Sequence, residues 1–126
     1  MRRAIGLLTL AVALIGSVAA AGRHPVIYVQ AVRYKPSVTP AEAEQMLRSL
    51  KQTFRKIPQV RSVRIGRVAR SSGPPYEYAV VMEFDSLEDL KLYGESEIHR
   101  RWVKEHVGDR IDQHLMLTVD AGSLDR

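Results

Sequence analysis

The sequence contains no cysteine among its 126 residues. This absence excludes disulfides, thiol catalysis and thiolate metal sites. The chain also lacks a glycine-rich phosphate loop, a nucleophile-elbow motif and a zinc-binding motif. The seven- and eight-residue gaps between His99, His106 and His114 match no standard metal-ligand spacing. We therefore expect neither a bound metal nor a cofactor.

A large excess of charge of one sign is also missing. The formal net charge is +5, and Arg2 and Arg3 supply two of these positive charges. Basic residues do gather between Arg48 and Arg70, but they recur at helical and strand spacings that are typical of solvated faces. The composition therefore favours no nucleic-acid partner.

The longest apolar stretch, from Ala4 to Ile15, is shorter than the roughly 20 residues of a membrane-spanning helix. Arg2 and Arg3 precede it, and the small residues from Val18 to Ala21 follow it. This order of charged, apolar and small residues is typical of a cleavable signal peptide. We expect a signal peptide over residues 1–21, export to the periplasm or the medium, and no membrane attachment after cleavage.

Residues 22–126 are enough for one small domain, with an expected core at 26–120. Alternation and β-branched residues predict a strand over Val26–Tyr34. Thr39-Pro40-Ala41-Glu42 combines an N-cap, a first-turn proline and a capping-box glutamate, which predicts a helix start. The apolar stripe of this helix comprises Ala43, Met46, Leu47, Leu50 and Phe54, and Ile57-Pro58 ends the helix.

Three further segments complete the domain. Residues Val60–Arg70, interrupted by Gly66, are typical of an edge strand, and Tyr76–Phe84 of a central strand. Ser86 with Asp89 predicts a second helix that breaks at 94–96, resumes and closes at Gly108. A last strand is expected over His114–Asp120.

The resulting order, βαββαβ, predicts an α+β, ferredoxin-like fold in which helices cover one face of a four-stranded antiparallel sheet. An apolar sheet face left uncovered would require a partner, so we expect a homodimer that forms an α/β barrel. The side chains expected on the uncovered face are Tyr28, Gln30, Val32, Tyr78, Val80, Met82, His114 and Met116.

Several local motifs occur in a familiar order. They are Arg33-Tyr34-Lys35 before the helix cap, Ile57-Pro58 followed by Val63 and Gly66, Tyr78–Phe84 followed by Asp85-Ser86, and Tyr93 with His99. In this order the chain from about Val26 to Asp120 resembles the stress-responsive dimeric α/β-barrel family. The family commonly carries Tyr-x-x-His-Pro-x-His, and here Ser96 and Glu97 replace the first histidine and the proline.

The resemblance implies a homodimer with a pocket between helices and barrel. In an enzymatic relative, a plant polyketide cyclase, the tyrosine and histidine that match Tyr93 and His99 catalyse an aldol closure. A second histidine on the first strand assists there, and Tyr28 occupies that position in this chain. Tyrosine, which titrates near pH 10, is a poorer base at neutral pH than histidine.

Two functions from different classes follow. The first is binding of a small apolar or aromatic molecule in the dimer pocket, with Tyr28, Tyr78, Trp102 and His114 as candidate ligand-binding residues. The alternative is a cofactor-free enzyme, polyketide cyclase-like or monooxygenase-like, with His99 and Tyr93 as its acid-base pair. Trp102 can instead be a packing residue, and Tyr28, Tyr78 and His114 can be dimer contacts. Haem held by His99, His106 or His114 is a third alternative.

Overall fold

The computed structural model describes residues 24–125. The elements follow in the order β1 (Val26–Tyr34), α1 (Pro40–Phe54), β2 (Ser62–Arg67), β3 (Tyr78–Phe84), α2 (Leu87–Glu95), α3 (Glu97–His106) and β4 (Ile111–Asp120). The predicted signal peptide, residues 1–21, lies outside the described residues. Over 24–125, no helix has both the length and the apolar character needed to cross a membrane.

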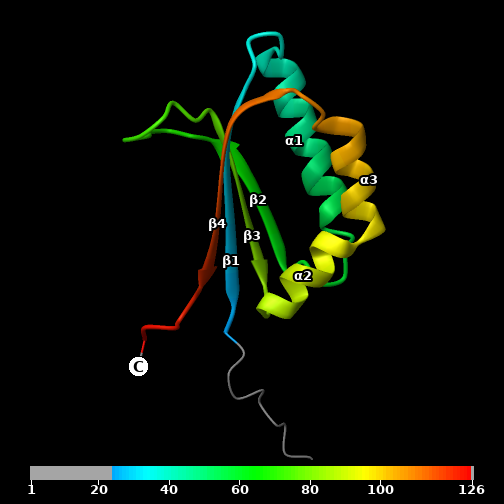
Figure 1. Cartoon of the computed structure of the whole chain (residues 1–126), viewed down its shortest axis with the longest axis vertical. Helices are drawn as coiled ribbons and strands as arrows, with labels where there is room; N and C mark the ends of the chain where they lie inside the picture. The colour runs from blue at the N-terminus through cyan, green and yellow to red at the C-terminus, as the bar shows by residue number, and fades with distance from the viewer. Residues whose placement is uncertain (1–23, 126) are drawn as a thin grey trace, which may run out of the picture.

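The four strands form one antiparallel sheet in the order β2-β3-β1-β4, which confirms the predicted split βαβ arrangement. Strand β1 is central, since it pairs with β3 from Val26↔Phe84 to Val32↔Tyr78 and with β4 along its other edge. Strands β2 and β4 are the two edges. All three helices lie over one face of this sheet, and the opposite face is bare (Figure 1).

Helix α1 begins where the sequence predicts it. The Thr39 side chain accepts a hydrogen bond from the Glu42 backbone N–H at 3.2 Å, and the Glu42 carboxylate accepts one from the Thr39 N–H at 2.9 Å. These two bonds satisfy N–H groups that have no partner within the helix. The helix is amphipathic, and its buried residues are Ala43, Leu47, Leu50 and Phe54.

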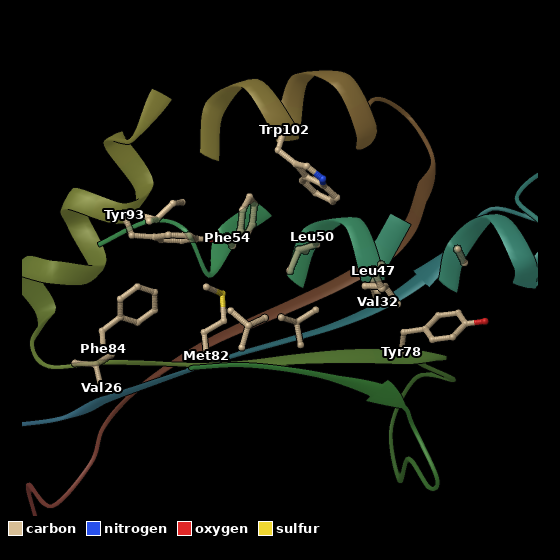
Figure 2. Close-up of a cluster of buried hydrophobic side chains, with 14 residues drawn as sticks. Val26, Val32, Leu47, Leu50, Phe54, Tyr78, Met82, Phe84, Tyr93 and Trp102 are labelled. Atoms are coloured by element: carbon tan, nitrogen blue, oxygen red, sulfur yellow. The ribbon is translucent and has the colours of Figure 1, made fainter. Parts of the chain in front are cut away.

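The hydrophobic core fills the space between the helices and the sheet (Figure 2). Phe54 is its centre on the helical side, since its ring lies 5.5 Å from that of Tyr93 and 5.2 Å from that of Trp102, both edge-on. From the sheet, Met82 and Phe84 are almost completely buried against these rings. The core therefore joins all three helices to the central strands.

The predicted orientation of the sheet was wrong. Val32, Tyr78, Val80 and Met82, which were expected on the uncovered face, are at most 7% exposed. Val32, Tyr78 and Met82 lie on the side of the sheet that the helices cover (Figure 2). Because side chains alternate along a strand, the odd-numbered residues of β1, β3 and β4 lie on the other face. The bare face is formed by Ile27, Val29, Ala31, Ala79, Val81, Leu115, Leu117 and Val119.

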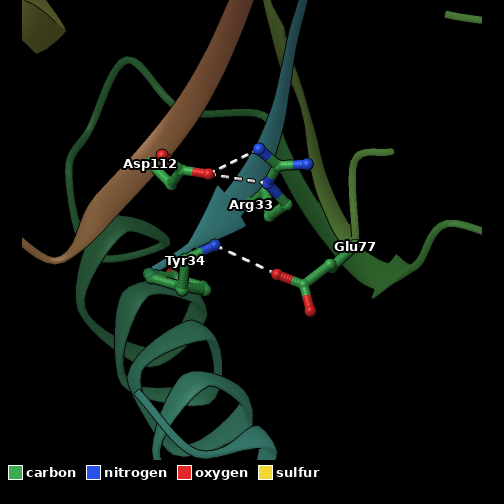
Figure 3. A network of polar contacts seen from close by, with 4 residues as sticks. All are labelled: Arg33, Tyr34, Glu77 and Asp112. Atoms are coloured by element: carbon green, nitrogen blue, oxygen red, sulfur yellow. Dashed lines mark hydrogen bonds and ion pairs between the residues drawn. The ribbon is translucent and has the colours of Figure 1, made fainter. Parts of the chain in front are cut away.

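A polar network holds the end of β1 (Figure 3). The Arg33 guanidinium donates two hydrogen bonds to one carboxylate oxygen of Asp112 on β4. The pairing register shifts between Arg33 and Tyr34, and the Tyr34 backbone N–H donates to the Glu77 carboxylate at 3.1 Å. These contacts continue the links from β1 to both neighbours beyond the regular ladder.

Three strands have boundaries that differ from the prediction, and one of them, β3, begins at Tyr78 instead of Tyr76. Strand β2 is limited to Ser62–Arg67, and the flanking Arg61 and Val68 N–H groups each donate one further backbone hydrogen bond, to Glu83 and Glu77 respectively. Strand β4 begins at Ile111, three residues before the expected start at His114. Gly108 has a positive φ of 49°, which explains why the segment ends there before the chain turns into β4.

Candidate functional site

The break between α2 and α3 places Tyr93 and His99 next to each other. Tyr93 lies in the last turn of α2 and His99 in the first turn of α3, with Ser96 in an extended conformation between the helices. A continuous helix would carry the two side chains onto different faces, because six residues span more than one and a half turns. The break instead brings their ring centroids to 4.6 Å.

Tyr93 and His99 line a pocket of about 360 Å³ together with Tyr28, whose side chain comes from β1. The other lining residues are Leu90, Gly94, Met116 and Thr118. The pocket thus lies between the α2–α3 corner and the β1–β4 half of the sheet. Tyr28 donates a hydrogen bond from its hydroxyl to the Met116 sulfur at 2.9 Å, across neighbouring strands.

Two buried polar atoms of this site have no hydrogen-bond partner among residues 24–125. They are the Tyr93 hydroxyl and His99 Nδ1. Tyr93 as a residue is only 2% exposed, and aromatic rings of Phe54 and Phe84 flank it. Leaving a buried polar group without a partner costs about 1–3 kcal/mol, so such groups are rare and a binding or catalytic role is one explanation for them.

Burial shifts the pKa values of the three titratable side chains in the pocket, Tyr93, Tyr28 and His99. Burial raises the pKa of Tyr93 far above its usual value, and the nearby Tyr28 adds to this effect. Burial also raises the pKa of Tyr28, against the effect of the Gln30 side chain. For His99, burial lowers the pKa below 6.5, the contact with the Gly94 backbone opposes this, and Arg100 adds to the lowering.

Near neutral pH, the site therefore presents two protonated phenols and a neutral imidazole. A protonated Tyr93 can donate a hydrogen bond to a ligand oxygen, whereas its raised pKa makes it a poor base. A neutral imidazole can accept a proton or a hydrogen bond. The arrangement is thus suited to an apolar ligand with a carbonyl or hydroxyl group.

Tyr78 lies in a different place from this pocket. It is on β3 and lines a second hollow of about 340 Å³ between α1 and β2, with Leu47 and Ile65. Glu44 within this hollow pairs with Arg67 and approaches Arg48 at 3.9 Å, and its carboxylate is 3.5 Å from the Tyr78 hydroxyl. The charged groups here are already paired with one another, whereas the pocket at Tyr93 and His99 contains a buried hydroxyl without a partner among the described residues.

Trp102 and His114 are not among the residues that line the Tyr93–His99 pocket. Trp102 is 7% exposed in the core, and its indole N–H donates to the Ser49 hydroxyl at 3.1 Å. This position favours the packing interpretation. His114 is exposed on β4, where its Nε2 is 3.4 Å from the Gln30 amide oxygen. Of the six predicted site residues, three therefore lie together: Tyr28, Tyr93 and His99.

The sequence did not assign Leu90, Met116 or Thr118 to this pocket. Leu90 precedes Tyr93 by three residues on α2, which is a helical-spacing signal for a shared face. Met116 and Thr118 reach the pocket through the pairing Gln30↔Met116 and Tyr28↔Thr118. Within residues 24–125, no three His, Asp or Glu side chains are grouped so that they could hold a metal ion.

Comparisons with solved structures agree with the topology. The chain is similar to a Dabb family protein with a ferredoxin-like fold from Mesorhizobium loti, with a TM-score of 0.69, 16% identity and coverage of 77% of this chain and 96% of that one. It is similar to a dimeric ferredoxin-like protein from Thermobifida fusca, with a TM-score of 0.67, 18% identity and coverage of 79% and 92%. A hydroxynitrile lyase from Passiflora edulis matches with a TM-score of 0.68, 15% identity and coverage of 77% and 93%.

At these identities, the solved structures show the shared fold and not a shared activity. Among proteins with curated descriptions, none matches the chain significantly. The family model of the stress responsive A/B barrel domain matches residues 29–120, which include β2, β3, β4 and all of β1 except its first three residues. The chain therefore belongs to the stress-responsive A/B barrel domain family.

Proposed function

We propose that this protein binds a small, largely apolar or aromatic molecule with a carbonyl or hydroxyl group in the pocket lined by Tyr28, Tyr93 and His99. The observation that carries the proposal is the buried Tyr93 hydroxyl, which has no hydrogen-bond partner among residues 24–125. A ligand oxygen can satisfy the hydroxyl, while Leu90 and Met116 contact the apolar part. The hollow beside Tyr78 offers no comparable unpaired group among its described residues.

The test uses acetophenone, an aromatic ketone, and ethylbenzene, its counterpart without oxygen. Saturation-transfer NMR should show that the wild-type protein binds the ketone about tenfold more tightly, which corresponds to one hydrogen bond of about 1.4 kcal/mol. Tyr93→Phe should abolish this difference, and Tyr78→Phe should retain it. Equal affinity of both compounds for the wild-type protein would contradict the proposal.

A second candidate is acid-base catalysis at the same site. A neutral His99 beside a protonated Tyr93 favours proton abstraction next to a carbonyl group, with the phenol stabilising the enolate oxygen. The similarity to a hydroxynitrile lyase from Passiflora edulis supports chemistry on this fold.

Exchange of the acetophenone methyl protons in deuterated water measures this proton abstraction directly. The wild-type protein should accelerate the exchange over buffer, His99→Ala should remove the acceleration, and Tyr93→Phe should reduce it. Binding without any acceleration would restrict the function to ligand binding.

We also propose that the chain forms a homodimer through the bare face of the sheet. Leu115, Leu117 and Val119 on this face are 38%, 49% and 45% exposed, which makes a contiguous apolar surface with the half-buried side chains of β1. Monomeric proteins rarely expose such a surface. The Thermobifida fusca protein of the same topology is a dimer, which supports this assembly.

Export remains a proposal that rests on Arg2, Arg3 and the apolar run that follows them. Intact-mass analysis of the protein recovered from envelope and medium fractions should give a chain that begins near Gly22. Full-length protein in the cytoplasmic fraction alone would contradict export.

A further inference from the structure

Met116 is at once part of the pocket wall and open to solvent. It lies on the edge strand β4 and is 56% exposed. Its sulfur accepts the hydrogen bond from the Tyr28 hydroxyl at 2.9 Å, and both residues line the pocket with His99. A thioether is a weak acceptor, so the Tyr28 hydroxyl is held by an atom whose chemistry can change.

The other methionines of residues 24–125 occupy different surroundings. Met82 is 0% exposed in the core, and Met46 is partly buried on α1, beyond this pocket. A second copy on the bare face would contact Leu115 and Leu117, whose side chains alternate with that of Met116 and point to the opposite side. Met116 therefore combines exposure with a contact to a pocket residue.

We propose that Met116 is a site of oxidative modification that regulates ligand binding in the pocket, an inference that rests on the proposed function. The oxidant is a hydroperoxide such as hydrogen peroxide. A sulfur lone pair attacks one peroxide oxygen and forms the S–O bond while the O–O bond breaks. The oxygen now bound to sulfur gives its proton to the departing hydroxide, which leaves as water. Sulfur loses two electrons, which reduce the peroxide, and the sulfoxide can be reduced back to the thioether.

The modification changes the polarity of the pocket. The sulfoxide oxygen is a much stronger acceptor than the thioether, so the Tyr28 hydroxyl should remain bound to residue 116 through a shorter, stronger bond. A flexible apolar side chain then becomes a polar one in the pocket wall. A ligand that packs against it must cover this dipole, which should weaken binding of an apolar molecule.

The first experiment locates the oxidation. The full chain is treated with limiting hydrogen peroxide, and peptide mass spectrometry follows the gain of one oxygen at Met46, Met82 and Met116 over time. Met116 should be oxidised on the order of tenfold faster than Met82, because susceptibility follows exposure. Oxidation of Met116 at or below the rate of Met46 or Met82 would overturn the proposal.

The second experiment tests the link to the pocket without a ligand. The ring resonances of Tyr28, assigned by comparison with Tyr28→Phe, should shift when Met116 is oxidised. Met116→Leu, which preserves the size of the side chain but has no sulfur, should show no shift after the same treatment. Selective oxidation with unchanged Tyr28 resonances would overturn the link.

The third experiment uses acetophenone as the probe. Oxidation should weaken its binding to the wild-type protein by about tenfold, equivalent to about 1.4 kcal/mol, and should leave Met116→Leu unaffected. If reduced protein binds no acetophenone, the proposed ligand class fails, and the mass and resonance measurements still decide on the modification. If oxidised and reduced proteins bind it equally, the regulatory role fails while the proposed function stands.

Discussion

The rings of Tyr93 and His99 meet at a centroid distance of 4.6 Å with an interplanar angle of 57°. Both also contact the ring of Phe54, which lies 5.3 Å from that of His99. The core residue Phe54 therefore packs against both rings of the pair. The ring contacts therefore contribute to packing and stability, whereas the Tyr93 hydroxyl, which has no partner among residues 24–125, can contribute to binding.

Replacement of Tyr93 by Phe should stabilise the protein. The change removes a buried hydroxyl that has no partner among the described residues and keeps the ring contacts with Phe54 and Phe84. We expect the free energy of unfolding to rise by about 1 kcal/mol, measured by urea denaturation. The matched Tyr78→Phe, which loses a contact with Glu44, should not be stabilised. A clear loss of stability in Tyr93→Phe would show that its hydroxyl has a structural partner.

Acidification should destabilise the fold through His99. Burial lowers the pKa of His99 in the folded chain, so the unfolded chain binds the proton at higher pH. The stabilisation is therefore present above about pH 6.5 and is lost as the pH falls through the lower, folded pKa. Urea denaturation between neutral and mildly acidic pH should show this loss, and His99→Gln should reduce it.

His114 must be separated from this effect, because burial lowers its pKa as well. The His114→Gln variant should reduce the pH dependence independently, and the double variant should show the flattest profile. Equal slopes in the wild-type protein and in His99→Gln would argue against a neutral, buried His99.

Substitutions on the two faces of the sheet should have opposite consequences. Leu117 is exposed on the bare face, so Leu117→Lys should give a folded monomer in sedimentation velocity by placing a charge in the proposed dimer contact. Val80 is 2% exposed beneath the helices, so Val80→Glu should unfold the chain instead, as circular dichroism would show. A Leu117→Lys dimer as stable as the wild-type one would exclude this face as the interface.

Trp102 and His99 should differ sharply in their importance for stability. Trp102→Ala removes a buried indole that packs on Phe54 and leaves Ser49 without its donor, so we expect a loss of about 3–5 kcal/mol. His99→Ala should cost about 1 kcal/mol, since the imidazole is only partly buried and Nδ1 has no partner among residues 24–125. Thermal unfolding of both variants measures the difference. Equal losses would show that His99 is a structural residue.

Much of the fold could be predicted because its local signals are independent of tertiary contacts. Thr39 and Glu42 form the capping box that their spacing predicts. The helix break near Ser96 is also visible locally, and with the family motif it placed Tyr93 and His99 in one site. Strand order followed from the alternation of elements, since a split βαβ unit has few allowed connections.

The orientation of the sheet could not be predicted in this way. Strand β1 carries apolar residues on both sides, such as Val29 and Val32, so its alternation does not distinguish the helix-covered face from the bare one. Glu83 is the informative residue, because it is exposed opposite Ile27 and marks the face away from the helices. An exposed carboxylate in an otherwise apolar strand is thus the signal that orients the sheet.

The composition of the site shows the same limit. Met116 reaches Tyr28 only because β4 pairs with β1 in one particular register, and a register depends on contacts between distant segments. Tyr78 and Trp102 are aromatic residues like Tyr28, but the sheet and the helices direct them to a separate hollow and to the core. Residue type alone cannot distinguish these three environments.

The central place of β1 also determines when the chain can fold. Strand β1 pairs with β3 on one side and with β4, the last of the four strands in the sequence, on the other. In the β1–β4 pair, Val26 lies opposite Asp120. Until β4 is available, the backbone N–H and C=O groups along one side of the apolar strand β1 have no partner strand. Pairing between segments that lie far apart in the sequence raises the contact order and slows folding relative to a fold built from local contacts. The sheet is therefore complete only when its fourth strand in sequence has paired with its first.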